Sequence, residues 1–169
     1  MKIGLAIIEG LVWSVLWMIT VMVVVQKFPW LIEHDYPEDV RKSGDFSPSN
    51  EREKKKGALF AGISFFLLMS LLISAGVVHY KGESTLYRFI WMHLWIMCMM
   101  WNIVDLIILD WLMICTWEMR WAILPGSKGC PGNRDYRFHA IGFVKGFFVM
   151  SLMSLFFAGI SYGIIQWIG

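Results

Sequence analysis

Four long hydrophobic runs divide the chain, and they cover residues 3–25, 58–78, 87–117 and 141–168. A membrane-spanning α-helix needs about 20 consecutive, mostly apolar residues, so each run is long enough to cross a bilayer alone. No run has the short alternating pattern of a barrel strand. The pattern therefore predicts an all-α integral membrane protein, with four transmembrane helices in an up-down bundle that forms a single domain over residues 1–169.

The composition supports this class. Of the 169 residues, 57% are hydrophobic and only 17% are charged, which is too apolar for a soluble domain of this size. We therefore expect the lipid bilayer as a partner and no nucleic acid. The cysteines Cys98, Cys115 and Cys130 form no CxxC pair, so we predict neither a disulfide framework nor a metal site, and no motif indicates a cofactor.

The polar segments set the expected orientation. Loops 27–57 and 118–138 hold seven and four Lys or Arg, whereas the terminus side holds only Lys2, Lys81 and Arg88. Because cytoplasmic loops of membrane proteins carry the excess of Lys and Arg, we predict that both loops are cytoplasmic and both termini lie outside, in a plasma (inner) membrane. Within the polar first loop, the segment from Pro37 predicts a short helix with proline at its start.

The third run carries polar residues that need an explanation. Asn102, Asp105 and Asp110 lie within it, and one aspartate at the bilayer centre costs about 2.5 to 3.5 kcal/mol. Asp110 is five positions beyond Asp105, so an α-helix would point it elsewhere. Lys145, about two turns into the fourth run, comes to a comparable depth. We therefore predict that Asp105, Asp110 and Lys145 form a charge pair or a proton relay.

Two stripes of polar and aromatic residues recur at helical spacing. One stripe runs from Glu9 to Thr20 on the first helix and the other from Trp91 to Asp105 on the third. If these stripes face each other, they enclose an aromatic-walled cleft with acids at both ends. Ligand-binding residues predicted on this basis are Glu9, Trp13, Trp17, Trp95, Asn102 and Asp105.

Such a cleft suits a cation, because indole faces attract ammonium groups and a carboxylate supplies the opposite charge. A desolvated carboxyl also tends to hold its proton, and exchange of that proton for a cation is a plausible coupling step. The sequence therefore favours a proton-coupled transporter or binder of a small cationic or lipophilic molecule. In plan it is similar to the small multidrug-resistance exporters, which are four-helix chains with a membrane glutamate on the first helix, but no motif is shared.

Two other classes stay open. The charged residues fit a structural or accessory subunit of a membrane complex, and a homodimer through small-residue faces is suggested by the pairs Gly142 with Gly146 and Gly159 with Gly163. A membrane-embedded enzyme acting on a lipid or quinone is the third class. No HExxH or GxSxG motif is present, so the sequence favours a non-enzyme. The glycine-rich loop 126–137 is best interpreted as a structured turn, with an anion site as the alternative.

Overall fold

A computed structural model describes residues 2–82 and 87–168, and in these ranges the regular structure is helical, with no strand. Each of four helical stretches is long and apolar enough to cross a membrane. These are α1 (Ile3–Lys27), α3 (Glu51–Tyr80), α4 (Tyr87–Val104) with its continuation η3 (Asp105–Thr116), and α5 (Tyr136–Ile168). The predicted class, an all-helical protein with four potential membrane spans, is confirmed.

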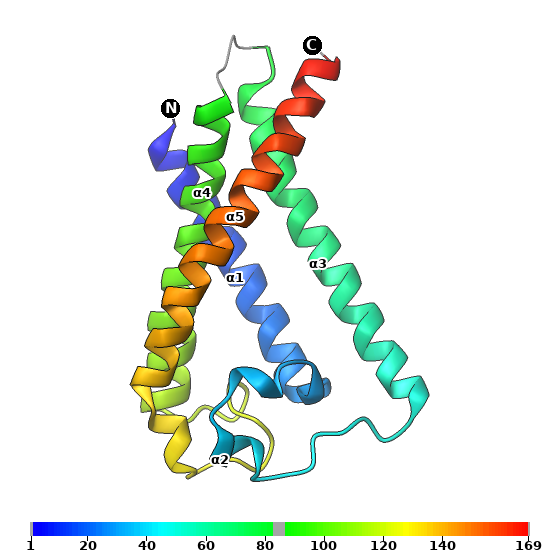
Figure 1. The fold of residues 1–169 in the computed structure, drawn as a ribbon, viewed down its shortest axis with the longest axis vertical. Coiled ribbons are helices and arrows are strands. Elements are labelled where there is room, and N and C mark those ends of the chain that lie inside the picture. The colour runs from blue at the N-terminus through cyan, green and yellow to red at the C-terminus, as the bar shows by residue number, and fades with distance from the viewer. Residues whose placement is uncertain (1, 83–86, 169) are drawn as a thin grey trace.

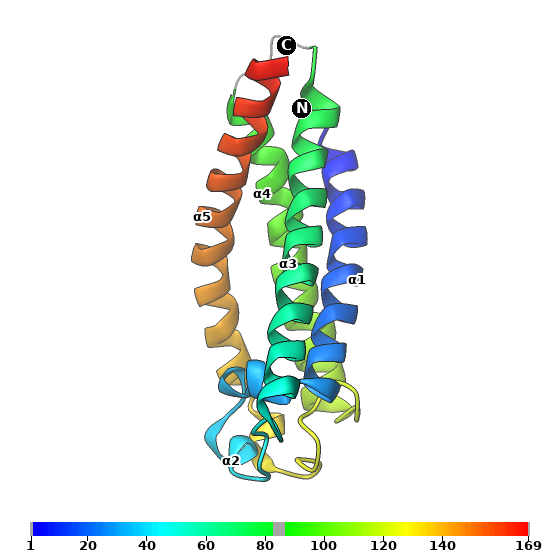
Figure 2. The ribbon, with the colours of Figure 1, turned by 90° about the vertical axis from the view of Figure 1, so that its right-hand side faces the viewer.

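Toward the end opposite the termini, α3 draws away from the other long helices, whereas the start of α5 lies beside the end of the α4 stretch (Figure 1). In the view turned by 90°, α4 lies behind α3 and between α5 and α1 (Figure 2), and it packs closely against both α1 and α5. Glycine permits the contact with α1, since a Cβ atom on Gly10 would lie 2.9 Å from Cβ of Met100. The fourth stretch uses Gly146 in the same way, because a Cβ atom there would overlap Oδ1 of Asn102.

The other glycines of the predicted small-residue faces are open. A Cβ atom on Gly142, Gly159 or Gly163 would meet no heavy atom within 4 Å. One member of the first pair, Gly146, is therefore used inside the chain, whereas the second pair faces outward. A homodimer through that second face stays a prediction.

A change of helix type follows Val104. Over Asp105–Thr116 the backbone is π-helical, and at its end the amide of Trp117 donates to the carbonyl of Leu112 over 3.0 Å. Because π-helical hydrogen bonds join residues five positions apart, Asp105 and Asp110 lie on nearly the same side of the helix. The expectation that Asp110 points elsewhere was wrong, since it assumed an α-helix throughout.

Two of the long helices begin earlier than their hydrophobic runs. The first turn of α3 is capped by Asn50, whose Oδ1 accepts from the amide of Glu53 at 2.9 Å, so the basic residues before position 58 are helical. At the start of α5, Oδ1 of Asp135 accepts from the amide of Phe138 at 2.9 Å. Polar caps therefore extend both helices beyond the apolar stretch that hydropathy detects.

The two long loops fold together beneath the separated helix ends, and we call residues 28–50 and 117–135 the loop cap (Figure 1). The cap contains the short helices η1 (Pro29–Leu31), η2 (Glu33–Asp35), α2 (Glu38–Arg41) and η4 (Pro131–Arg134). The hydroxyl of Tyr36 donates to the carbonyl of Ala122 at 2.6 Å, and the amide of Gly132 donates to Asp39 at 2.7 Å. Helix α2 confirms the short helix predicted after Pro37.

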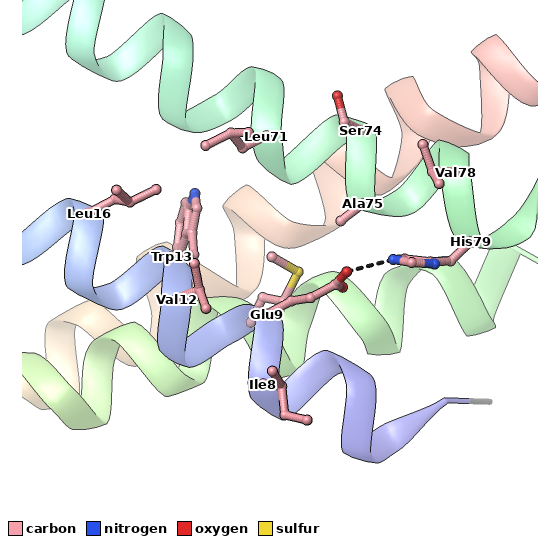
Figure 3. A pocket seen from close by; sticks show the side chains of 11 residues that line it. Ile8, Glu9, Val12, Trp13, Leu16, Leu71, Ser74, Ala75, Val78 and His79 are labelled. Atoms are coloured by element: carbon pink, nitrogen blue, oxygen red, sulfur yellow. Dashed lines mark hydrogen bonds and ion pairs between the residues drawn. The ribbon is translucent and has the colours of Figure 1, made fainter.

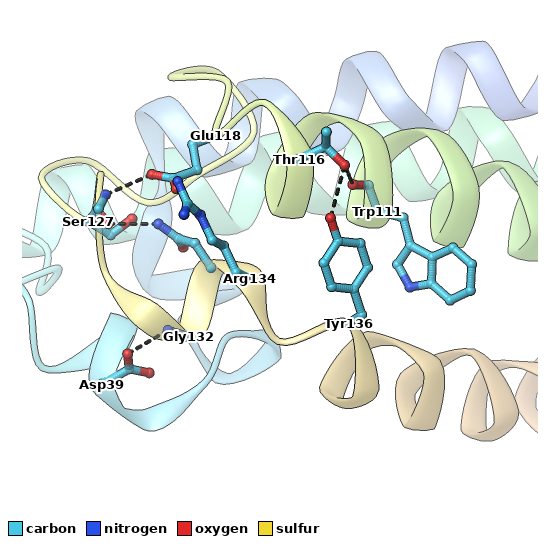
Figure 4. A network of polar contacts seen from close by, with 10 residues as sticks. Asp39, Trp111, Thr116, Glu118, Ser127, Gly132, Arg134 and Tyr136 are labelled. Atoms are coloured by element: carbon cyan, nitrogen blue, oxygen red, sulfur yellow. Dashed lines mark hydrogen bonds and ion pairs between the residues drawn. The ribbon is translucent and has the colours of Figure 1, made fainter.

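The glycine-rich loop is a folded part of this cap (Figure 4). Glu118 is buried, and its carboxylate accepts from the amide of Gly129 and from Nε of Arg134, each at 2.8 Å. These contacts, led by the Gly129 amide, lower the pKa of Glu118. The structured turn is confirmed. Because the carboxylate of Glu118 already accepts from the Gly129 amide, this amide is not free to bind an external anion.

Candidate functional site

Polar side chains inside the bundle gather in two separate places. One is the histidine cluster, which comprises Glu9, His79, His93 and Tyr80 near the end that carries the termini. The other is the acidic cavity, which lies between the loop cap, η3 and α5. His93 on α4 and Asp105 at the start of η3 are separated by about 18 Å along the helix axis. The two groups therefore form distinct sites.

The histidine cluster ties three helices together. Nε2 of His79 on α3 lies 2.6 Å from Oε1 of Glu9 on α1, and Nε2 of His93 on α4 lies 2.8 Å from Oε2 of the same carboxylate (Figure 3 draws the first of these). The two imidazole rings stack at 5.6 Å, and the hydroxyl of Tyr80 is 3.4 Å from Nδ1 of His93. Both oxygens of Glu9 are thus occupied by neighbours from the same chain.

A first cavity, of about 410 Å³, opens beside this cluster between α1 and α3. Glu9 and His79 lie at one end of it, and apolar side chains such as Val12 and Leu71 form most of its wall (Figure 3). The indole of Trp13 also lines it, but Nε1 of that ring already donates to the carbonyl of Leu68 at 2.9 Å. This cavity therefore offers few polar groups that lack a partner.

The acidic cavity also has a volume of about 410 Å³, but its wall is rich in ionisable groups. Carboxyl groups reach it from two parts of the chain, with Asp35 in the loop cap and Asp105 and Asp110 on η3. Its other polar or aromatic lining residues are His34, Tyr36, Trp101, Phe138, His139 and Lys145. Three carboxyl groups face a single lysine, so the wall carries excess negative charge when all three are ionised and the histidines are neutral.

The carboxyl groups of the cavity affect the pKa values of two loop-cap residues, Tyr36 and Asp35. Burial raises the pKa of Tyr36, and the carboxylates of Asp110, Asp35 and Asp105 raise it further. The phenol therefore stays protonated and donates to the Ala122 carbonyl. Partial desolvation raises the pKa of Asp35, against the lowering effect of His34 at 3.4 Å, and Asp110 adds to the increase. The shift is modest in its consequences, because the Asp35 side chain is 67% exposed at the mouth of the cavity. The cavity thus penalises additional negative charge and favours a cation.

One group in the acidic cavity lacks a partner. Nδ1 of His139 lies 3.0 Å from Oδ1 of Asp110. The side chain is only 5% exposed, and within residues 2–82 and 87–168 its Nε2 atom has no hydrogen-bond partner. A buried polar atom without a partner costs about 1 to 3 kcal/mol, so its retention beside a cavity marks a place where a ligand can supply the missing bond.

The structure divides the predicted ligand-binding residues between different surroundings. Glu9 and Trp13 line the first cavity, whereas Asp105 lines the acidic cavity. Trp17 stacks on Trp101 at 5.7 Å between the two sites. The single cleft between the first and third hydrophobic runs is therefore not assembled.

The reason is that part of the second stripe faces α5 and not α1. Nε1 of Trp95 donates to Oγ of Ser151 at 3.0 Å, and Nδ2 of Asn102 donates to the carbonyl of Phe143 at 3.2 Å. Because α4 is central, opposite faces of one helix meet different neighbours. Helical spacing identified the stripe but could not choose the partner helix.

The predicted charge relay is only partly brought together. Lys145, Asp105 and Asp110 line the same cavity, yet in the part of the chain that the structure describes Lys145 forms no ion pair with either aspartate. Asp110 contacts His139 instead. The functional pairing of Lys145 with an aspartate stays a prediction.

Sequence reasoning missed the histidines as site residues. Glu9 and His93 each lie near the start of their hydrophobic runs, and in an up-down bundle the first and third runs point in the same direction. The two residues are therefore expected at the same depth, which was sufficient to suggest their contact. No comparable signal exists for His139, because its contact with Asp110 depends on the π-helical turn and on the earlier start of α5. The cap residues Asp35 and Tyr36 were also missed, since no periodicity relates a loop to a helix.

Comparisons with protein-family models, with curated proteins and with solved structures find no match to this chain. Its class therefore rests on its own features. Four apolar helices of sufficient length indicate a membrane-embedded, multi-pass protein. Among the described residues, the histidine cluster holds a carboxylate with both oxygens in contact, and the acidic cavity holds a buried imidazole nitrogen without a hydrogen-bond partner.

Proposed function

We propose that this protein binds a small organic cation in the acidic cavity and transports it in exchange for protons. The observation that carries the proposal is the convergence of Asp35, Asp105 and Asp110 on one cavity that contains a single lysine. The indole of Trp101 lines the same space and offers a face that attracts ammonium groups. Charge and aromatic surface together favour a cation with an apolar part.

The size and ligand set favour an organic cation over a metal ion. A cavity of about 410 Å³ lies within the range of about 300 to 1,000 Å³ that small-molecule sites occupy. In the described ranges, no group of three His, Cys, Asp or Glu side chains is arranged to hold a metal ion. An ammonium ion with an aromatic or alkyl substituent fits both observations.

Proton exchange follows from the same carboxylates. When the cation leaves, an ionised carboxylate in a poorly hydrated cavity loses its counter-charge, and uptake of a proton restores neutrality. Saturable uptake of benzylammonium into vesicles containing the purified protein, driven by an imposed pH gradient, tests this step. If uptake equals that of protein-free vesicles both with and without the gradient, the protein does not transport this cation.

The proposal includes an orientation. The four helices cross a plasma (inner) membrane up and down, both termini lie outside, and the loop cap is cytoplasmic, so the acidic cavity receives its ligand from the cytoplasmic side. The excess of Lys and Arg in the two long loops supports this arrangement. Under this orientation, Ser47, which is exposed in the cap, lies inside the cell.

Labelling with a membrane-impermeant thiol reagent tests the orientation. Cys98 and Cys115 are buried, whereas Cys130 is partly exposed, so a Cys130→Ser background gives the cleanest signal. Ser47→Cys in that background should react only after the cells are permeabilised. Reaction in intact cells would reverse the orientation.

A further inference from the structure

His139 limits which cations fit the acidic cavity. Its imidazole is held by Asp110, with Nδ1 and Oδ1 3.0 Å apart. Because an ionised carboxylate only accepts hydrogen bonds, Nδ1 must carry the hydrogen. In the neutral imidazole Nε2 is then an acceptor, and this buried atom has no partner within the described residues. Asp110 thus acts as a positioning residue that fixes the tautomer of His139.

The rest of the wall also presents acceptors in excess of donors. Asp35 and Asp105 bring carboxylate oxygens to the cavity. Tyr36 is not a free donor, because its hydroxyl already donates to the Ala122 carbonyl at 2.6 Å. Lys145 is the main cationic donor among the lining residues. A ligand that satisfies this wall must therefore bring hydrogen-bond donors as well as positive charge.

We infer that the ligand is a protonated amine that carries N–H groups, and not a quaternary ammonium ion. One N–H donates to Nε2 of His139, a second interacts with the carboxylate of Asp105, and the apolar substituent packs against the indole of Trp101. A quaternary ammonium ion offers charge but no N–H, so it leaves Nε2 of His139 buried without a partner. This inference rests on the proposed function, since it concerns the same cavity.

A methylation series tests the inference with the intact protein. Benzylammonium and its N-methyl, N,N-dimethyl and N,N,N-trimethyl derivatives are titrated calorimetrically into the purified protein at neutral pH. All four carry one positive charge, but only the last lacks an N–H. The last methyl group should therefore lower the affinity by about tenfold or more, whereas a purely steric effect would lower it by similar factors at each step.

His139→Asn is the matched variant. The amide nitrogen of asparagine can take the place of Nδ1 and donate to Asp110, while the acceptor at Nε2 is deleted. The variant should bind benzylammonium about tenfold more weakly and bind the trimethyl derivative as the wild-type protein does. If the variant does not fold, the methylation series on the wild-type protein still decides.

The outcomes separate this inference from the function on which it rests. Equal affinity of the wild-type protein for the dimethyl and trimethyl ions would overturn the role of His139 while leaving a cation site in place. The same conclusion would follow if His139→Asn still bound the dimethyl ion more tightly than the trimethyl ion. Failure of the wild-type protein to bind any member of the series would reject the cation site itself.

Discussion

The histidine cluster and the acidic cavity both combine histidine with a carboxyl group, but they differ in whether the buried polar atoms have hydrogen-bond partners. In the cluster, both oxygens of Glu9 contact imidazole nitrogens from α3 and α4. In the cavity, Nε2 of His139 has no partner within the described residues. Buried polar groups stabilise a fold only when they are satisfied. The comparison favours the cluster as a structural tie and is consistent with the ligand site that we propose in the cavity.

The largest effect on stability is expected in the cluster. Glu9→Leu removes the carboxylate that contacts Nε2 of His79 and Nε2 of the fully buried His93, so it should destabilise the protein by about 2 to 4 kcal/mol. Thermal unfolding in detergent measures this loss. Glu9→Gln is the matched control, because its amide retains hydrogen-bonding capacity and should recover part of the stability.

Unchanged thermal stability in Glu9→Leu would contradict the structural interpretation of the cluster. A loss of cation binding in a variant that remains folded would blur the distinction between the two sites, since the cluster would then contribute to ligand recognition.

The next largest effect tests the packing that brings Glu9 to His93. Gly10→Ala forces a Cβ atom to 2.9 Å from Met100 and 3.0 Å from the backbone of Met97, so we expect a loss of about 1 to 3 kcal/mol. Gly4→Ala on the same helix meets nothing within 4 Å and should be neutral or slightly stabilising. Equal thermal stabilities of the two variants would show that α1 does not approach α4 this closely.

A smaller effect is expected in the loop cap that closes the acidic cavity. Hydrogen bonds from Gly129 and Arg134 lower the pKa of Glu118 in the folded state, below the unfolded value of about 4.3. Its contribution to stability is therefore present above that value and is lost as the pH falls through the lower, folded pKa. Hydrogen exchange at the Gly129 amide should report this loss on acidification.

Glu118→Gln supplies the control for that measurement. The neutral side chain cannot titrate, so amide protection of Gly129 should be lower at neutral pH and should lose the acid-dependent step. An identical pH profile in the two proteins would show that Glu118 does not hold the cap.

The sequence was informative about elements and less so about which faces meet. Hydropathy located four spans because lipid imposes a minimum apolar length on a helix. The cost of exposing an aspartate to lipid placed Asp105 in the interior. Nothing in the sequence anticipated that π-helical geometry brings Asp110 to the same side of the helix. Trp95 and Asn102 were identified as interior residues, yet their partners on α5 depend on how α4 is rotated between two neighbours. Such rotations are set by packing at positions like Gly10 and Gly146, which periodicity cannot resolve.

The most direct test of the comparison is a calorimetric titration of benzylammonium into the wild-type protein, Asp105→Asn and Glu9→Gln. Asp105→Asn keeps the shape of the side chain and removes its charge, so binding should weaken by about 1 to 3 kcal/mol while thermal stability is maintained. Wild-type affinity should also fall as the pH is lowered and Asp35, whose pKa is raised, takes up a proton. Glu9→Gln should bind like the wild-type protein. The opposite pattern, in which Glu9→Gln abolishes binding and Asp105→Asn leaves it unchanged, would contradict the placement of the ligand site in the acidic cavity.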